Sequence, residues 1–120
     1  MAKVMVVDDA VSDVKLIESI LRGAGYQVVS YGDGEGLEQK VVTERPDVLL
    51  LDIVMPKRSG YEVLRSLKKD AVTKTTPVVL VTSKNQASDE FWGRRQGADD
   101  YLGKPFTPEQ LVSMVRRFVR

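Results

Sequence analysis

The sequence contains no cysteine and no histidine. Without cysteine there can be no disulfide and no thiolate metal site, and without histidine there is no imidazole for catalysis or metal binding. Any bound metal must therefore use oxygen ligands, which is typical of hard cations such as Mg²⁺. The lack of cysteine also suits a reducing compartment, and we expect a cytoplasmic protein.

Long apolar runs and an excess of charge of one sign are missing as well. No run approaches the ~20 apolar residues of a membrane span, and the first residues lead straight into a short apolar run, so we expect neither a membrane segment nor a signal peptide. The net charge of +1 gives no electrostatic reason to expect nucleic acid as a partner. The 120 residues are enough for one domain, which we expect to occupy residues 1–120.

The most informative stretch is the apolar run at residues 48–51, which ends directly at Asp52. A short run that is apolar on both faces predicts a central strand of a parallel sheet, covered by helices on each side. Asp52 then stands at the carboxyl end of that strand, where ligands bind in open α/β sheets. Considered alone, Asp52 could equally cap a loop or a helix.

Strand-like runs and helix-like spacing alternate along the rest of the chain. Further strands are predicted at residues 4–7, 28–29, 78–81 and 101–102, and an amphipathic helix is predicted after each of the five strands. We expect Ser12 and Ser88 to be the N-caps of the first and fourth helices, Pro108 to begin the last helix, and Phe118 to lie on its apolar face. Such an alternation predicts an α/β fold with a doubly wound parallel sheet.

Polar residues follow four of the five predicted strands at their carboxyl ends. They are Asp8 and Asp9, Asp52, Thr82, and Lys104. Because parallel strands end at the same edge of a sheet, we expect these side chains to converge in one cleft. Crowded carboxylates repel unless a cation is present, and oxygen ligands favour Mg²⁺. A carboxylate beside a metal, a hydroxyl and an ammonium is a plausible acceptor of a phosphoryl group.

Four motifs carry a resemblance to a known family. MVVDD (residues 5–9), LLLDIVMPKRSG (49–60), VTS (81–83) and YLGKPF (101–106) resemble the receiver domain of two-component response regulators, in the right order and over essentially the whole chain. The resemblance implies a flavodoxin-like (βα)5 fold with strand order 2-1-3-4-5. It also implies a cis peptide bond between Lys104 and Pro105.

The same resemblance implies the site. Asp52 would accept a phosphoryl group from a phosphohistidine on a sensor histidine kinase or a phosphotransfer domain. Asp9 and Asp52, with the carbonyl of Val54, would hold Mg²⁺, and Asp8 would act directly or through water. Lys104 and Thr82 would bind the phosphoryl oxygens.

The resemblance further implies a switch. Thr82 would move toward the phosphoryl group, and Tyr101 would turn inward to report it. A downstream protein would bind the surface of the fourth helix, fifth strand and last helix. In isolation, Thr82 and Lys104 would more simply be a strand-end hydroxyl and a solvated charge, and Tyr101 a half-buried aromatic. Those simpler interpretations do not explain why the residues converge.

We therefore expect a phosphorylation-switched signalling protein and not an enzyme, apart from self-phosphorylation and slow self-dephosphorylation. The alternative is a receiver that acts as a phosphate sink or was cut from a larger regulator. A dehalogenase-type hydrolase would need Asp-x-Asp where this chain has Asp52-Ile53-Val54. A flavodoxin-like cofactor carrier would need a phosphate-binding loop where Asp8 and Asp9 would repel phosphate. Residues 83–106 are similar to receivers of type IV pilus, twitching and phototaxis systems.

Overall fold

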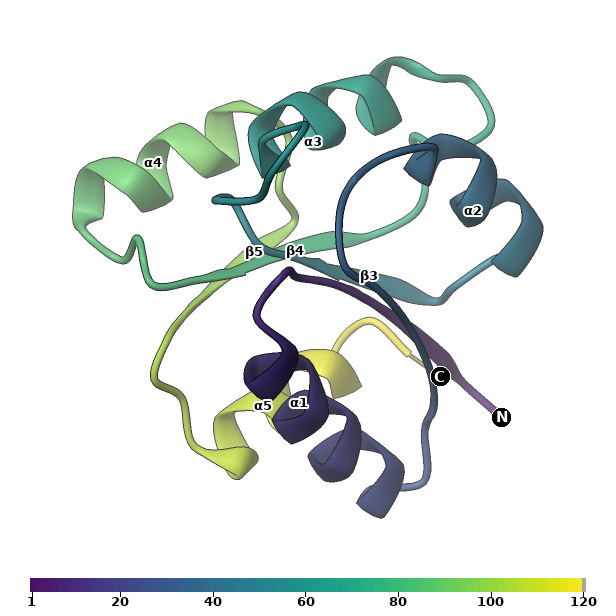
Figure 1. The fold of residues 1–120 in the computed structure, drawn as a ribbon, viewed down its shortest axis with the longest axis vertical. Coiled ribbons are helices and arrows are strands. Elements are labelled where there is room, and N and C mark those ends of the chain that lie inside the picture. The colour runs from purple at the N-terminus through teal and green to yellow at the C-terminus, as the bar shows by residue number, and fades with distance from the viewer. Residues whose placement is uncertain (120) are drawn as a thin grey trace.

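The computed structural model describes residues 1–119, which form a parallel sheet of five strands between two layers of helices (Figure 1). Residue 120, which belongs to the expected domain, lies outside the described residues. The strands are β1 (Lys3–Val7), β2 (Gln27–Tyr31), β3 (Val48–Leu51), β4 (Val78–Thr82) and β5 (Asp100–Gly103). The helices are α1 (Val11–Gly23), α2 (Leu37–Glu44), α3 (Gly60–Lys69), α4 (Ala87–Arg95) and α5 (Pro108–Arg116).

The strand order is β2-β1-β3-β4-β5, which confirms the predicted doubly wound sheet. Strand β3 lies at the centre, paired in parallel with β1 on one side and β4 on the other. All four of its residues are buried, as expected for a strand covered by helices on both faces. The carboxyl ends of β1, β3 and β4 therefore lie side by side at one edge.

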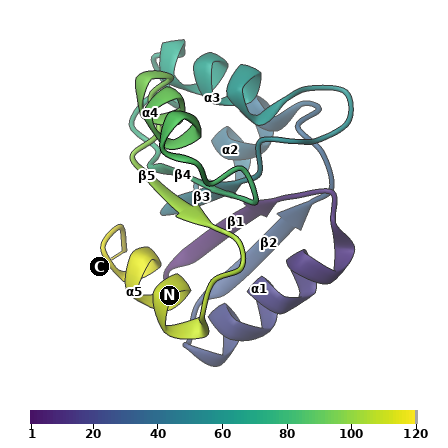
Figure 2. The same cartoon turned by 90° about the vertical axis from the view of Figure 1, so that its left-hand side faces the viewer.

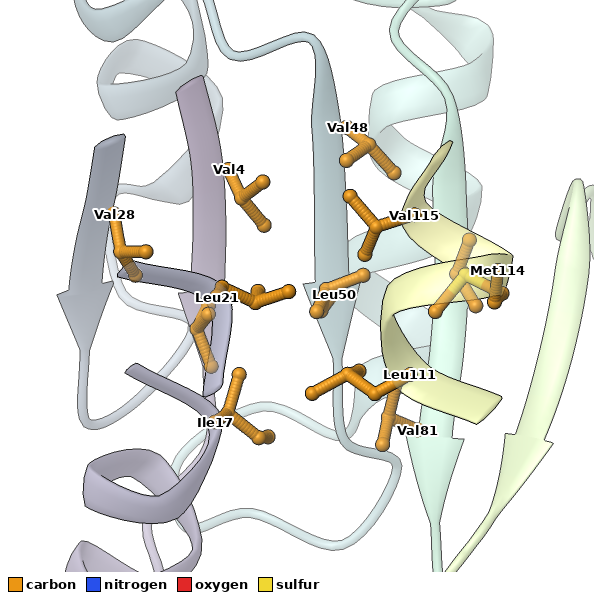
Figure 3. Close-up of a cluster of buried hydrophobic side chains, with 12 residues drawn as sticks. Val4, Ile17, Leu21, Val28, Val48, Leu50, Val81, Leu111, Met114 and Val115 are labelled. Atoms are coloured by element: carbon orange, nitrogen blue, oxygen red, sulfur yellow. The ribbon is translucent and has the colours of Figure 1, made fainter. Parts of the chain in front are cut away.

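Two hydrophobic cores separate the sheet from its helices. Helices α1 and α5 cover one face, and α2, α3 and α4 cover the other (Figures 1 and 2). On the first face, Ile17 and Leu21 of α1 meet Leu111 and Val115 of α5 over Leu50 of the central strand (Figure 3). On the second face, α2 and α3 contribute Leu37, Val41, Val63, Leu64 and Leu67. No helix among residues 1–119 is both long and apolar enough to cross a membrane.

The helix ends differ from the sequence prediction at three places. Helix α1 begins at Val11, before Ser12, because the Asp8 carboxylate accepts the Ala10 N–H at 2.9 Å and turns the chain early. Helix α4 begins at Ala87, so Ser88 is not its cap; instead the Asp89 carboxylate accepts the N–H of the N-cap residue Gln86 at 3.2 Å. Helix α5 ends at Arg116, and Phe118 packs against the first core from beyond the helix.

Candidate functional site

The predicted site residues lie where four strands end. Asp8 follows β1, Asp52 follows β3, Thr82 is the last residue of β4, and Lys104 follows β5. Backbone hydrogen bonds continue the sheet past the strands, since Asp52 N–H donates to Val7 C=O at 3.0 Å and Lys104 N–H donates to Thr82 C=O at 2.8 Å. The sheet itself therefore holds these residues at one edge, as the sequence predicted.

The Lys104 ammonium joins three carboxylates at this edge. Its Nζ lies 2.6 Å from Asp8 Oδ2, 2.8 Å from Asp13 Oδ2 and 3.6 Å from Asp52 Oδ2. The first two distances are charge-assisted hydrogen bonds, whereas the third is an ion pair beyond hydrogen-bond length. The peptide bond between Lys104 and Pro105 is cis, as the family resemblance implied. Asp13 was not predicted from the sequence, because no strand-end or motif rule points to it.

Burial and charge act against each other in this group. Burial raises the pKa of the Asp8 carboxyl, and the hydrogen bond from Lys104 only partly offsets the effect. For Lys104, burial alone would lower the pKa, but the hydrogen bonds to Asp13 and Asp8 outweigh it and raise the pKa above its usual value. The lysine is therefore firmly charged and acts as a tethered counter-ion for the buried carboxylates.

The acidic residues fit a divalent cation. Asp8, Asp9 and Asp52 each offer a carboxylate oxygen, and these atoms lie within 4.8 Å of one another. Oxygen ligands alone suit Mg²⁺. Among residues 1–119, Lys104 is the only cation paired with the buried Asp8 and Asp52. Asp9, by contrast, is exposed, and it forms no ion pair with any other described residue.

The loop after β3 brings the start of helix α3 close to the backbone of Asp52. The Ile53 N–H binds Asp52 Oδ1 at 2.7 Å, and the Gly60 N–H binds the Ile53 carbonyl at 2.7 Å. A Cβ at Gly60 would overlap the Asp52 carbonyl oxygen and lie 2.8 Å from the Ile53 Cα. Glycine at this position thus lets the N-terminus of α3 approach the Asp52 backbone, a role that the sequence did not reveal. Val54 lies in the same loop and is 59% exposed.

Thr82 and Tyr101 share one backbone partner. The buried Thr82 Oγ1 accepts the Lys84 N–H at 3.3 Å, and the Tyr101 hydroxyl donates to the Lys84 carbonyl. Burial raises the pKa of the Tyr101 hydroxyl, which therefore stays a donor. The ring lies against Gly93 of α4, where a Cβ would meet it at 3.1 Å. The loop after β4 is thus in contact with both residues that the sequence assigned to the switch.

Comparison with known proteins agrees with this geometry. The model of the response regulator receiver domain family matches residues 4–116. Protein PilH of Pseudomonas aeruginosa is 42% identical over 118 residues, covering 96% of this chain and 95% of that protein. The alkaline phosphatase synthesis transcriptional regulatory protein PhoP of Bacillus subtilis is 37% identical over 98% of this chain, which spans 48% of PhoP.

Solved structures share the fold over nearly the full chain. Chemotaxis protein CheY4 of Vibrio cholerae superposes with a TM-score of 0.90 at 33% identity, covering 99% of both chains. The receiver domain of the sensor histidine kinase PA1611 of P. aeruginosa, with a magnesium ion coordinated in its active site cleft, gives 0.89 at 26% identity, covering 98% of this chain and 96% of its own. By sequence and by fold, the chain belongs to the response regulator receiver domains, the phosphorylation-switched signalling modules of two-component systems.

Proposed function

We propose that Asp52 accepts the phosphoryl group, delivered from a phosphohistidine on a sensor histidine kinase or a phosphotransfer domain. An oxygen of Asp52 attacks phosphorus, the bond from phosphorus to the imidazole nitrogen breaks, and its electron pair stays on the imidazole. We assign the attack to Oδ2, because Oδ1 accepts the Ile53 N–H while Oδ2 faces Lys104. The observation that carries the proposal is the convergence of Asp8, Asp52 and Lys104 at the carboxyl ends of β1, β3 and β5.

In the proposed mechanism, Asp8, Asp9 and Asp52, together with the Val54 carbonyl, would hold Mg²⁺. The ion would neutralise charge on the incoming phosphoryl group and among the carboxylates. Lys104 would bind a phosphoryl oxygen with its ammonium. Thr82 would exchange its contact with the Lys84 N–H for a hydrogen bond from its own hydroxyl to the phosphoryl group.

The proposed readout passes through the loop after β4. When Thr82 leaves the Lys84 N–H, the Lys84 carbonyl that accepts the Tyr101 hydroxyl would move with it. Tyr101 packs against α4, so this change would reach the surface formed by α4, β5 and α5. Phe91 and Trp92 on α4 are 63% and 51% exposed, and they are apolar contact groups for a downstream protein on that surface.

We further propose that residues 1–120 form one receiver domain, working in the cytoplasm and contacting neither nucleic acid nor membrane. Its only chemistry would be self-phosphorylation and slow self-dephosphorylation. The full-length similarity to Protein PilH and the resemblance of residues 83–106 support a place in a motility pathway of the type IV pilus kind. A phosphate sink would use the same chemistry without a downstream protein. Capture of a partner by the beryllofluoride-treated protein, but not by the untreated one, would favour the switch over the sink.

The acceptor is tested by mass spectrometry. Incubation with acetyl phosphate and Mg²⁺ should add one phosphoryl group to the wild type and none to Asp52→Asn. The matched control is Asp47→Asn, since Asp47 precedes the opposite end of β3 and binds the Lys3 N–H at 2.7 Å, away from the site. Labelling that survives in Asp52→Asn, or is lost equally in both variants, would overturn the assignment.

A further inference from the structure

Asp13 makes a contact that the phosphoryl chemistry described above does not require. It lies in the first turn of α1, and its Oδ2 is 2.8 Å from Lys104 Nζ although the two residues are 91 positions apart. The same ammonium is 3.6 Å from Asp52 Oδ2. The resting lysine is therefore hydrogen-bonded to Asp8 and to α1, and not to the proposed acceptor.

The contact is a charge-assisted hydrogen bond to a lysine with little access to solvent. The Lys104 side chain is only 14% exposed, so its charge is poorly solvated and depends on the Asp8 and Asp13 carboxylates. Asp13 is 41% exposed, and solvent weakens its share of the pair without removing it.

A bound cation would make Asp13 more important. The oxygen cluster suited to a cation consists of Asp8, Asp9 and Asp52, and it does not include Asp13. A cation there would compensate the charge of Asp8 and so weaken its attraction for Lys104. Asp13 would then be the main carboxylate competing with the phosphoryl oxygens for the ammonium.

We propose that Asp13 is a positioning residue that holds Lys104 on the α1 side of the site and weakens its binding to the phosphoryl group. The inference rests on the proposed function, in which Lys104 binds the phosphoryl oxygens. Asp13 is not one of the carboxylates of the cation cluster, and the contact through which it would act is its hydrogen bond with Lys104. Asp13 thereby determines how strongly Lys104 stabilises a phosphoryl group on Asp52.

The test measures the affinity for beryllofluoride, an analogue of the phosphoryl group, at saturating Mg²⁺. Asp13→Asn should bind it roughly three- to fivefold more tightly than the wild type, the size expected for a partly exposed ion pair. Asp13→Glu, which keeps the carboxylate, should return toward the wild-type affinity. Glu18→Gln is the matched control. It also removes a negative charge from α1, but this carboxylate pairs with Arg22, at 3.2 Å. It should change the affinity little.

The route through Lys104 is tested by repeating the measurement in a Lys104→Met background. There, Asp13→Asn should have no larger effect than Glu18→Gln. A readout independent of Mg²⁺ and beryllofluoride is the free energy of urea unfolding in EDTA. The double variant Asp13→Asn, Lys104→Met should be more stable than the sum of the two single losses predicts, because that sum counts the loss of the contact between Asp13 and Lys104 twice. If Lys104→Met does not fold, the beryllofluoride affinities of Asp13→Asn, Asp13→Glu and Glu18→Gln still decide whether the inference holds.

Each failure has its own signature. Equal affinities for Asp13→Asn and Glu18→Gln, or weaker binding by Asp13→Asn, would overturn the inference and leave the acceptor assignment intact. If Asp13→Asn tightened beryllofluoride binding equally in the wild-type and Lys104→Met backgrounds, the effect would be due to long-range charge. That result would also overturn the inference. A wild-type protein that binds no beryllofluoride, or an Asp52→Asn variant that binds it normally, would instead contradict the proposed function.

Discussion

The pairing of Glu38 with Arg58 should make the stability of the fold depend on pH in acid. The Arg58 guanidinium donates two hydrogen bonds to the Glu38 carboxylate, at 2.9 and 2.7 Å, and a third to the Gly34 carbonyl at 3.1 Å. Ser66 of α3 adds a further hydrogen bond to Glu38. These contacts fasten the loop that follows Asp52 to the start of α2. A substitution that removes these hydrogen bonds therefore tests contacts that stabilise both the fold and the loop beside Asp52.

The bidentate pairing with Arg58 lowers the pKa of Glu38 from 4.5 to about 2. A shift of that size sets a ceiling of about 3 kcal/mol on the stabilisation. Because the Glu38 and Arg58 side chains stay 30% and 26% exposed, solvent screening reduces it to about 1–2 kcal/mol. The folded-state pKa lies below the unfolded one, so this stability is present above pH 4.5 and is lost as the pH falls toward 2.

The assay is urea unfolding of the wild type and Glu38→Gln at a series of pH values from 7 to about 3. At neutral pH the variant should be less stable by about 1–2 kcal/mol, and the gap should narrow steadily below the unfolded-state pKa of 4.5. The control is Glu35→Gln, which breaks an ion pair in the same region, but one whose Glu35 side chain is 69% exposed. A Glu38→Gln gap that stays constant or widens in acid would refute this reasoning.

Three further outcomes are expected. Gly60→Ala should destabilise the fold by roughly 3 kcal/mol or more in thermal unfolding, because the new methyl meets the Asp52 backbone; Gly23→Ala, which meets no atom within 4 Å, should not. Asp9→Asn should melt slightly higher than the wild type in EDTA, through reduced repulsion, and lose the stabilisation by Mg²⁺; retained stabilisation would remove Asp9 from the metal site. Val54→Asn with Lys84→Glu should shorten the lifetime of the phosphorylated form roughly tenfold, about 1.4 kcal/mol of barrier, because the new side chains can orient the attacking water; an equal or longer lifetime would contradict this.

The residues at the strand ends could be predicted from the sequence because a backbone rule fixes their position. A parallel sheet must place the carboxyl ends of its strands together, whatever side chains follow. Asp8, Asp52, Thr82 and Lys104 are each the last residue of a strand or the residue after it, and the structure finds all four at that edge. The apolar runs that identify the strands also bury the sheet on both faces, so the doubly wound sheet was predictable from the same pattern, whereas its strand order followed from the family resemblance.

Helix starts were less predictable because several side chains can cap the same turn. Ser12 has the chemistry of an N-cap, but the Asp8 carboxylate binds the Ala10 N–H first. In the same way, helix α4 starts before Ser88, where the Asp89 carboxylate accepts the Gln86 N–H. Propensity ranks residue types one at a time, whereas the observed start depends on which neighbouring oxygen reaches a free N–H.

The sequence predicted which side chains converge but not how they pair, and Lys104 shows why. The strand-end rule fixes its backbone, but its flexible four-carbon stem lets the ammonium reach three carboxylates. Which of them it favours depends on the position of α1, and the Asp8 hydrogen bond that starts α1 at Val11 helps to set that position. Asp8 thus both pairs with Lys104 and helps to bring Asp13 within its reach. A substitution in the first turn of α1 should therefore change how the site binds a phosphoryl group without altering any of the motifs that identify the family.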